Sequence, residues 1–226
     1  MDNDKKIRER LRILLERRSI RKFRPDPVPL SLARAVIEYA THAPSATNTQ
    51  GWRFIVVTDP DLIRKVVDAG GSALMAEAPC GILVTYPNTT RNRYYQDDFQ
   101  SAAAAIQNLL LAAHAFGMGA CWICTLPPRP FLRRVFRIPP HYSPIAYVLL
   151  GFPRGGPVQE VARRHPLDEI IGENIFPPRG AAPARPRLLT WCERILIRIY
   201  SSLPVGIKKR YLNRFVDRKF VKKFEN

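Results

Sequence analysis

The sequence predicts an α+β protein, with a central mixed sheet flanked by helices and a basic helical C-terminal extension. Three features predict this class. Short buried-strand runs alternate with helical apolar spacings up to residue 176, and apolar types make up 46% of the residues. A proline-rich stretch then separates this part from a basic tail. We expect a folded domain over 1–176, a linker over 177–186 and a helical extension over 187–226.

The elements of the domain follow from the apolar spacing. A first, amphipathic helix is predicted from Ile7, Leu11, Leu14 and Leu15, and a second from an N-cap at Ser31 to Ala40. Strands are expected over 54–57, 82–84 and 144–151, and further helices over 61–69 and 98–116. The helix over 98–116 is rich in alanine and apolar around most of its surface, so it is predicted to lie centrally, covered on most sides.

The charge is unusual for a globular chain. Lys and Arg number 36 against 19 Asp and Glu, a formal net charge of +17, which favours anionic partners. The four cysteines are too few for a disulfide framework, and a charged N-terminus is not typical of a secretory signal. No apolar stretch reaches the length of about 20 residues that spans a bilayer, so the expected location is the cytoplasm.

The tail over 187–226 is the most basic part of the chain. Apolar and aromatic side chains recur there at helical spacing among lysines and arginines. Such helices can pack on the partner subunit of a dimer, or they can bind an anionic membrane surface at the inner face of the membrane. Nucleic acid is the least favoured partner, because no known binding module is present.

Two segments could bind an anion or a polar ligand. Arg17, Arg18, Ser19 and Arg21 place three guanidinium groups and a hydroxyl within five residues, a set that suits phosphate, although spacing alone also allows a solvated basic face. The loop over 43–52 gathers hydroxyls and amides directly before a buried strand, which suits a ligand with hydroxyls and carbonyls or an ordinary turn. Further along, Arg163 and Arg164 lie in a basic loop.

Cys121 and Cys124 form a C-x-x-C pair. Zinc needs four ligands and no second pair exists, so no metal site is predicted. Ordinary packing is the favoured interpretation, and dithiol chemistry stays open.

In this order and at these distances, the segments resemble the nitroreductase family of flavoproteins. The matching pieces are Arg17–Arg21, Pro44–Trp52, Ala102–Trp122, Gly151–Pro153 and Arg164–Leu167. The resemblance covers about residues 10–176 and implies the fold of that family. It also implies a homodimer with two FMN sites, each built from both chains.

The resemblance also implies roles for single residues. Arg17, Arg18, Ser19 and Arg21 would face the phosphate and the pyrimidine side of the ring, with Arg164 and Arg163 completing the phosphate clamp. Pro44, Ser45, Asn48 and Gln50 would meet the flavin of the partner subunit. A backbone N–H at Ile123 or Cys124 would reach flavin N5. No side chain is predicted as catalytic acid or base.

The implied activity is hydride transfer from NAD(P)H, through FMN, to an electron-poor organic acceptor of the nitroaromatic, quinone or enone type, in a ping-pong cycle. The alternative is a flavin fold without turnover that binds a membrane or polyanion through its tail. The sequence departs from the family pattern at two places. Gly51 stands where the family often has Pro, and it is expected to loosen the loop. Residues 70–74 are small and apolar, so the substrate preference is left undecided. Residues 88–96, with aromatics and arginines, could take an anionic aromatic substrate or be a solvated loop.

Overall fold

The computed structural model describes residues 2–89, 92, 94–155, 166–177, 191, 192 and 195. These residues belong to two compact units, one ending near Gly156 and one beginning after it. The first unit contains the sheet and most helices. Arg163, Arg164, the linker over 178–186 and nearly all of the basic tail lie outside the described residues.

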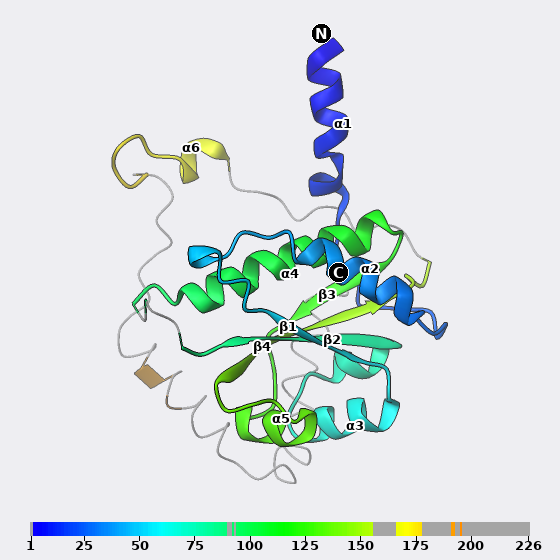
Figure 1. Ribbon diagram of the computed structural model, residues 1–226. Helices are drawn as coiled ribbons and strands as arrows, with labels where there is room; N and C mark the ends of the chain where they lie inside the picture. The colour runs from blue at the N-terminus through cyan, green and yellow to red at the C-terminus, as the bar shows by residue number, and fades with distance from the viewer. Residues whose placement is uncertain are drawn as a thin grey trace. The chain divides into compact units, whose positions relative to one another are not determined.

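Four strands form the sheet of the first unit. They are β1 (Arg53–Val57), β2 (Cys80–Pro87), β3 (Gly119–Ile123) and β4 (Tyr142–Gly151), in the order β1-β2-β4-β3 (Figure 1). All three pairings are antiparallel. A mixed sheet was predicted. Among the described residues, parallel pairing occurs only at an isolated bridge between Ser19 and Ala120.

Helices cover both faces of this sheet (Figure 1). α2 (Leu30–Ala40) and α4 (Asp97–Ala115) pack on one face, where Val36, Ile106 and Leu109 meet strand side chains such as Ile82 and Val148. α3 (Pro60–Asp68) and α5 (Arg129–Phe136) belong to the opposite core, which has its own set of buried side chains. That set includes Ile63, Leu83, Leu132, Tyr147 and Leu149. Because successive strand residues point to opposite faces, each strand supplies both cores.

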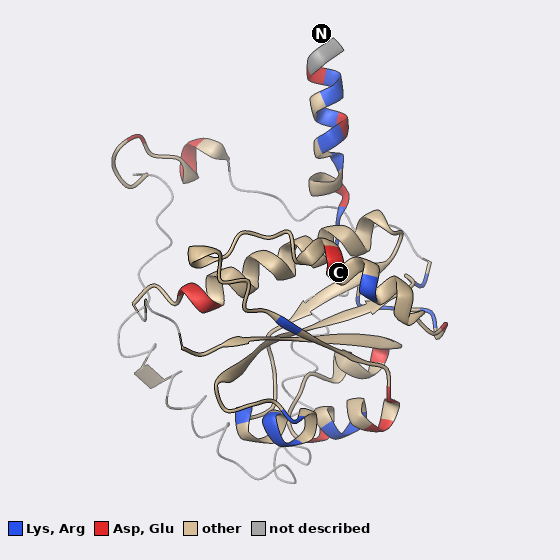
Figure 2. Ribbon diagram, viewed as in Figure 1, with Lys and Arg blue, Asp and Glu red and all other residues tan. Residues whose placement is uncertain are grey.

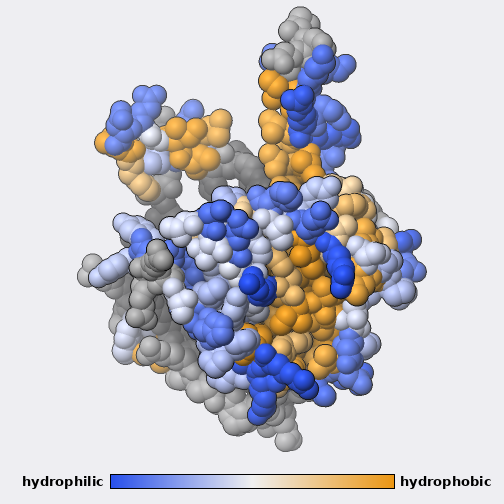
Figure 3. Space-filling model, viewed as in Figure 1, coloured by the Kyte–Doolittle hydropathy of each residue, from blue (hydrophilic) through white to orange (hydrophobic). Residues whose placement is uncertain are grey.

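The N-terminal helix α1 (Asp2–Glu16) has the predicted amphipathic pattern, but its apolar side is exposed. Ile7, Leu11 and Leu14 keep 44–53% of their surface accessible, and Leu15 keeps 69%. Figure 3 shows this apolar side on α1, next to a hydrophilic one. Burial inside one copy of the chain therefore does not account for the pattern of this helix.

Most predicted elements are present, but one helix start was misplaced and four short elements were missed. The strands expected at 54–57, 82–84 and 144–151 are β1, β2 and β4, and the alanine-rich helix is α4, which is covered on most sides as expected. The N-cap at Ser31 was wrong. The helix begins at Leu30 because the Pro29 carbonyl already accepts from the backbone N–H groups of Leu32 and Ala33. The sequence analysis missed β3, α5 and the short 3₁₀ turns η1 (Ala46–Asn48) and η2 (Ala73–Glu77).

The second unit contains α6 (Leu167–Ile170), the short helix start that follows the basic loop. Throughout the described residues, no helix combines the length and apolarity needed to cross a bilayer. The predictions that concern the tail, including binding to an anionic membrane surface, fall outside the described residues.

Candidate functional site

The basic segment Arg17–Phe23 lies along the outer edge of the sheet, against β3. Ser19 forms a parallel bridge with Ala120, and the Ile20 N–H donates to the Ala120 carbonyl at 3.0 Å. The approach is close, because a Cβ added at Gly119 would stand 2.7 Å from Ile20 Cγ2. The glycine therefore lets the segment reach β3, the strand that contains the cysteine pair.

The far end of this segment is held by the end of β4. Phe23 bridges Pro153, the Arg24 N–H donates to the Phe152 carbonyl at 2.9 Å, and the Arg154 N–H donates to the Lys22 carbonyl at 3.0 Å. The late Gly-Phe-Pro motif thus fixes the same segment that β3 fixes at its start. Two motifs singled out separately in the sequence meet here.

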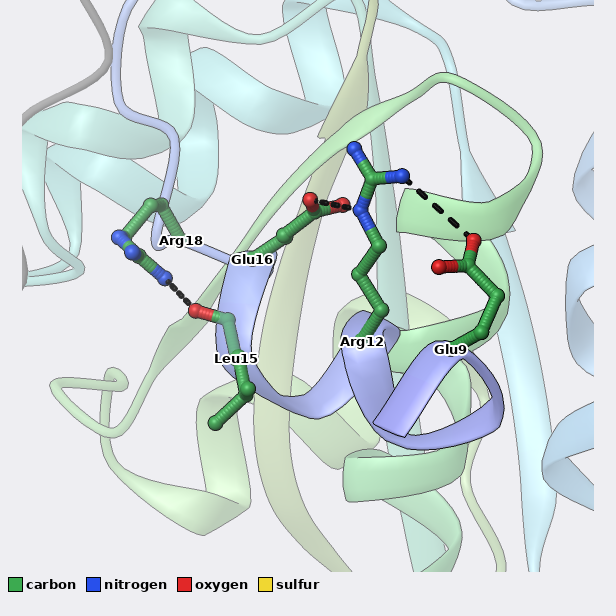
Figure 4. Close-up of polar contacts among 5 residues, drawn as sticks. All are labelled: Glu9, Arg12, Leu15, Glu16 and Arg18. Atoms are coloured by element: carbon green, nitrogen blue, oxygen red, sulfur yellow. Dashed lines mark hydrogen bonds and ion pairs between the residues drawn. The ribbon is translucent and has the colours of Figure 1, made fainter. Parts of the chain in front are cut away.

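Arg17 and Arg18 have different surroundings. Arg17 is half-buried, and its Nη1 is buried with no hydrogen-bond partner among the described residues. Arg18 Nη1 donates to the carbonyl of Leu15 at 2.5 Å and to that of Arg17 at 2.8 Å, at the carboxyl end of α1 (Figure 4). A cation is favoured there because helix C-terminal carbonyls carry partial negative charge. Arg17 Nη1, by contrast, has no such carbonyl acceptor among the described residues.

The last turns of α1 are held by ion pairs on its surface. Arg12 lies between Glu9, at 3.5 Å, and Glu16, whose carboxylate also accepts from Arg12 Nε (Figure 4). Exposed pairs of this spacing each contribute about 0.3–0.5 kcal/mol to helix stability. They steady the helix end from which the basic segment starts.

The two cysteines of the C-x-x-C pair have different environments. Cys121 is buried, and burial raises the pKa of its thiol, while the nearby Arg21 and Arg17 and a hydrogen bond with Ser19 oppose the rise. Cys124 is exposed and follows the end of β3. Cys80 is also buried, and desolvation raises its pKa to about 11. Among the described residues, no group of three or more His, Cys, Asp or Glu side chains could hold a metal ion.

These environments predict selective thiol labelling. In a Cys192→Ser background near neutral pH, an aromatic disulfide reagent should modify Cys124 rapidly and leave Cys80 and Cys121 protected until the protein unfolds, because the thiolate is the reacting form and buried thiols stay protonated. Peptide mapping by mass spectrometry gives the sites. A further Cys124→Ser change should abolish the rapid phase. Rapid modification of Cys121 in the native protein would contradict its burial.

The second predicted segment forms a strained, exposed loop. Thr47, Asn48 and Gln50 have φ values of 52°, 54° and 48°, in the left-handed region that non-glycine residues seldom adopt. Ser45 Oγ accepts from the Gln50 N–H at 3.0 Å, and Asn48 Oδ1 accepts from Gln50 Nε2 at 2.8 Å. Pro44, Asn48 and Gln50 are exposed. Such strain is concentrated at ligand-binding positions in proteins.

Two residues that the sequence analysis did not single out hold this loop in place. The Ala46 N–H donates to Ser101 Oγ, in α4, at 3.0 Å. Ser101 Oγ in turn donates to the Asp97 carbonyl at 2.7 Å. A Cβ added at Gly51 would stand 2.7 Å from Pro87 Cδ and 3.1 Å from Tyr86 Cζ, so the loop passes close to the end of β2. Glycine, which has no Cβ, permits this close approach.

The two segments are attached near opposite ends of α4. The loop is bound to Ser101, in the first turns of the helix, whereas Ser19 pairs with Ala120, five residues beyond the helix end at Ala115. At a rise of 1.5 Å per residue, Ser101 and Ala115 are roughly 21 Å apart along the axis. The structure thus brings Arg17, Ser19 and Arg21 together with Cys121 on β3, and it anchors Pro44–Gln50 separately.

Comparison with known proteins places these features in a family. The family model described as "Nitroreductase family" matches residues 14–72 and 66–152. A Methanothermobacter thermautotrophicus protein named "Putative NADH dehydrogenase/NAD(P)H nitroreductase" is 33% identical over 151 residues, covering 65% of this chain and 78% of the relative. An "NADH dehydrogenase" of Thermus thermophilus is 32% identical over 194 residues, covering 70% and 92% of the two chains.

The fold gives the same result. The solved structure of an FMN-dependent nitroreductase from Clostridium difficile R20291 matches with a TM-score of 0.59 at 23% identity, covering 73% of this chain and 98% of that one. The resemblance carried by the sequence motifs, the match to the family model and the similarity of fold all agree. This chain belongs to the nitroreductase family.

Proposed function

We propose that this chain is an FMN-dependent oxidoreductase that transfers hydride from NAD(P)H to an electron-poor organic acceptor, of the nitroaromatic, quinone or enone type, in a ping-pong cycle. The observation that carries the proposal is the buried Nη1 of Arg17 beside β3, which has no hydrogen-bond partner in the part of the chain that the structure describes. It lies in a segment that the family comparison covers. Burying a guanidinium donor without a partner is costly, so the arrangement calls for an anion.

The residues present fit a flavin phosphate. Arg17, Ser19 and Arg21 provide cationic and hydroxyl donors within one short segment, and guanidinium forks match phosphate oxygens two at a time. The proximity of both arginines to Cys121 shows that their charges extend over the β3 strand. We propose that Arg18, Arg164 and Arg163 add to this clamp.

We propose that the site is shared by two copies of the chain in a homodimer. The loop residues Pro44, Ser45, Asn48 and Gln50 are anchored about 20 Å along α4 from the basic segment, and in the proposed dimer a second copy brings its loop to each clamp. The exposed apolar side of α1 provides surface that a partner subunit can bury. Such burial contributes about 25 cal/mol for each Å² of apolar surface removed from water.

The protein's contribution to the chemistry is positioning and electrostatics. FMN, when bound, supplies hydride transfer between the nicotinamide and the acceptor. Arg17 and Arg21 favour negative charge on the bound group, which raises its reduction potential. A backbone N–H at Ile123 or Cys124 would donate toward the ring, and this role does not depend on the Cys124 side chain. No side chain is assigned as acid or base.

The purified full-length protein tests this proposal directly. It should be yellow, with absorption bands at about 370 and 450 nm that bleach on anaerobic addition of NADH or NADPH and return with a quinone or nitroaromatic acceptor. Initial rates at varied donor and acceptor should give parallel double-reciprocal lines. A colourless protein that does not take up added FMN would refute the proposal.

A further inference from the structure

A pocket of ≈ 450 Å³ lies where the strained loop, the end of β2 and the start of α4 meet. It is lined by Ala46, Thr47, Thr49, Tyr86, Pro87, Thr89, Asp97, Asp98 and Ser101. The volume is in the range of sites for small organic molecules, about 300–1,000 Å³. Figure 2 shows acidic residues at the start of α4, at the end where this pocket lies.

Three residues that line the pocket each have a buried oxygen atom with no hydrogen-bond partner within the described part of the chain. The atoms are Asp97 Oδ1, Asp98 Oδ1 and Tyr86 Oη. Asp98 is only 6% exposed and Tyr86 only 4%, so both side chains are more than nine-tenths buried. A buried polar atom without a partner destabilises the fold, and a charged one does so more strongly. Three such atoms around one pocket indicate a site completed by a ligand.

The chemistry of the lining selects the ligand. Asp97 and Asp98 are the charged side chains among the described residues that line the pocket, in a chain whose net charge is +17. A carboxylate accepts hydrogen bonds, and a tyrosine hydroxyl both accepts and donates. The threonines contribute further hydroxyls. A ligand that satisfies all three atoms must therefore bring several N–H donors and positive charge.

We propose that this pocket binds a small organic cation, of the amidinium, guanidinium or primary ammonium type, whose N–H groups lie against Asp98, Asp97 and Tyr86. The volume favours an organic cation over a bare metal ion, which would leave most of the space unfilled. The proposed ligand is a cation, whereas the sequence suggested an anionic aromatic substrate for residues 88–96. The proposal also goes beyond the proposed flavin chemistry.

Isothermal titration of the FMN-loaded, full-length protein with benzamidinium, benzamide and benzoate tests it. The three probes share a ring and differ in charge. Benzamidinium should bind at least about tenfold more tightly than benzoate, and Asp98→Asn should weaken benzamidinium at least about tenfold, because charged hydrogen bonds contribute roughly 1.5–3 kcal/mol. Tyr86→Phe should weaken it to a smaller extent. Asp61→Asn, an exposed carboxylate on α3, is the matched control and should leave all three affinities unchanged.

Three outcomes would overturn the proposal. They are equal affinity for all three probes, unchanged benzamidinium binding in Asp98→Asn, and displacement of benzamidinium by stoichiometric Mg²⁺, which would make the site a metal site. Thermal melting of each variant shows whether it folds. If Asp98→Asn has a folding defect, Tyr86→Phe supplies the test of the pocket. Flavin content measured on the same samples separates failure of this proposal from failure of the proposed function.

Discussion

Replacing Arg17 by Ala should lower the affinity for FMN by about 10- to 100-fold, because a charged hydrogen bond to phosphate contributes roughly 1.5–3 kcal/mol. Arg17 is the strongest candidate because its buried Nη1 has no partner in the described structure. Arg17→Lys should lose less, since it keeps the charge but not the planar fork. Arg21→Ala should also weaken FMN retention. The measurement is the dissociation constant for FMN added back to the apoprotein, followed by flavin fluorescence.

Arg64→Ala is the matched control for this series. Arg64 lies on α3, exposed and paired with Asp61 at 2.9 Å, so its removal changes the net charge equally without touching the β3 edge. The control should retain FMN as the parent protein does. Unchanged FMN affinity in both Arg17→Ala and Arg21→Ala would contradict the assigned clamp.

Mixing Arg17→Ala chains with chains of a loop variant, Asn48→Ala, tests whether each site is shared between two copies. Arg17→Ala chains have an intact loop, and Asn48→Ala chains have an intact clamp. If each site takes its clamp from one copy and its loop from the other, every mixed dimer contains one intact site. Refolding the two variants together should therefore give one site in each mixed dimer with the parent affinity for FMN, which neither variant has alone. Absence of recovery in confirmed mixed dimers would place both segments at one site within a single copy.

Gly81→Ala should destabilise the protein by about 3 kcal/mol or more, at the upper end of the costs of overpacking a core. Gly81 lies in β2, between Val57 on one neighbouring strand and Leu149 on the other. A Cβ there would stand 1.9 Å from Tyr147 Oη and 2.0 Å from its Cζ. Tyr147 is only 2% exposed, so its ring has no free space to move into. Urea unfolding measures the loss.

A double-mutant cycle shows whether the ring causes this loss. Tyr147→Leu removes the ring, so adding Gly81→Ala to that variant should cost about 1 kcal/mol or less. Gly155→Ala is the control, because nothing lies within 4 Å of a Cβ added there. An equal cost of Gly81→Ala in both backgrounds would show that strand propensity, rather than the tyrosine, explains the glycine.

Local patterns account for the elements that sequence analysis found. α4 has an alanine-rich run with a helical apolar face, and β2 and β4 have continuous buried runs, so the residues of each element specify its class. β3 escaped because it is only five residues long, begins at Gly119, contains the first cysteine of the pair and shows no clear alternation. α5 escaped because prolines surround its start, although proline is well tolerated in a first helical turn.

The sequence by itself determined the basic segment, the polar loop and the family to which their order belongs, because these depend on residue types at fixed spacing. Only the tertiary structure decided that Arg17 Nη1 is buried without a partner among the described residues, whereas Arg18 closes a helix end. The tertiary structure also decided that Gly51 and Gly119 permit close contacts. Only the fold brings Tyr86, from β2, next to Asp98, from α4. Such pairings join residues distant in sequence, and their energies depend on burial and distance, which local spacing does not encode.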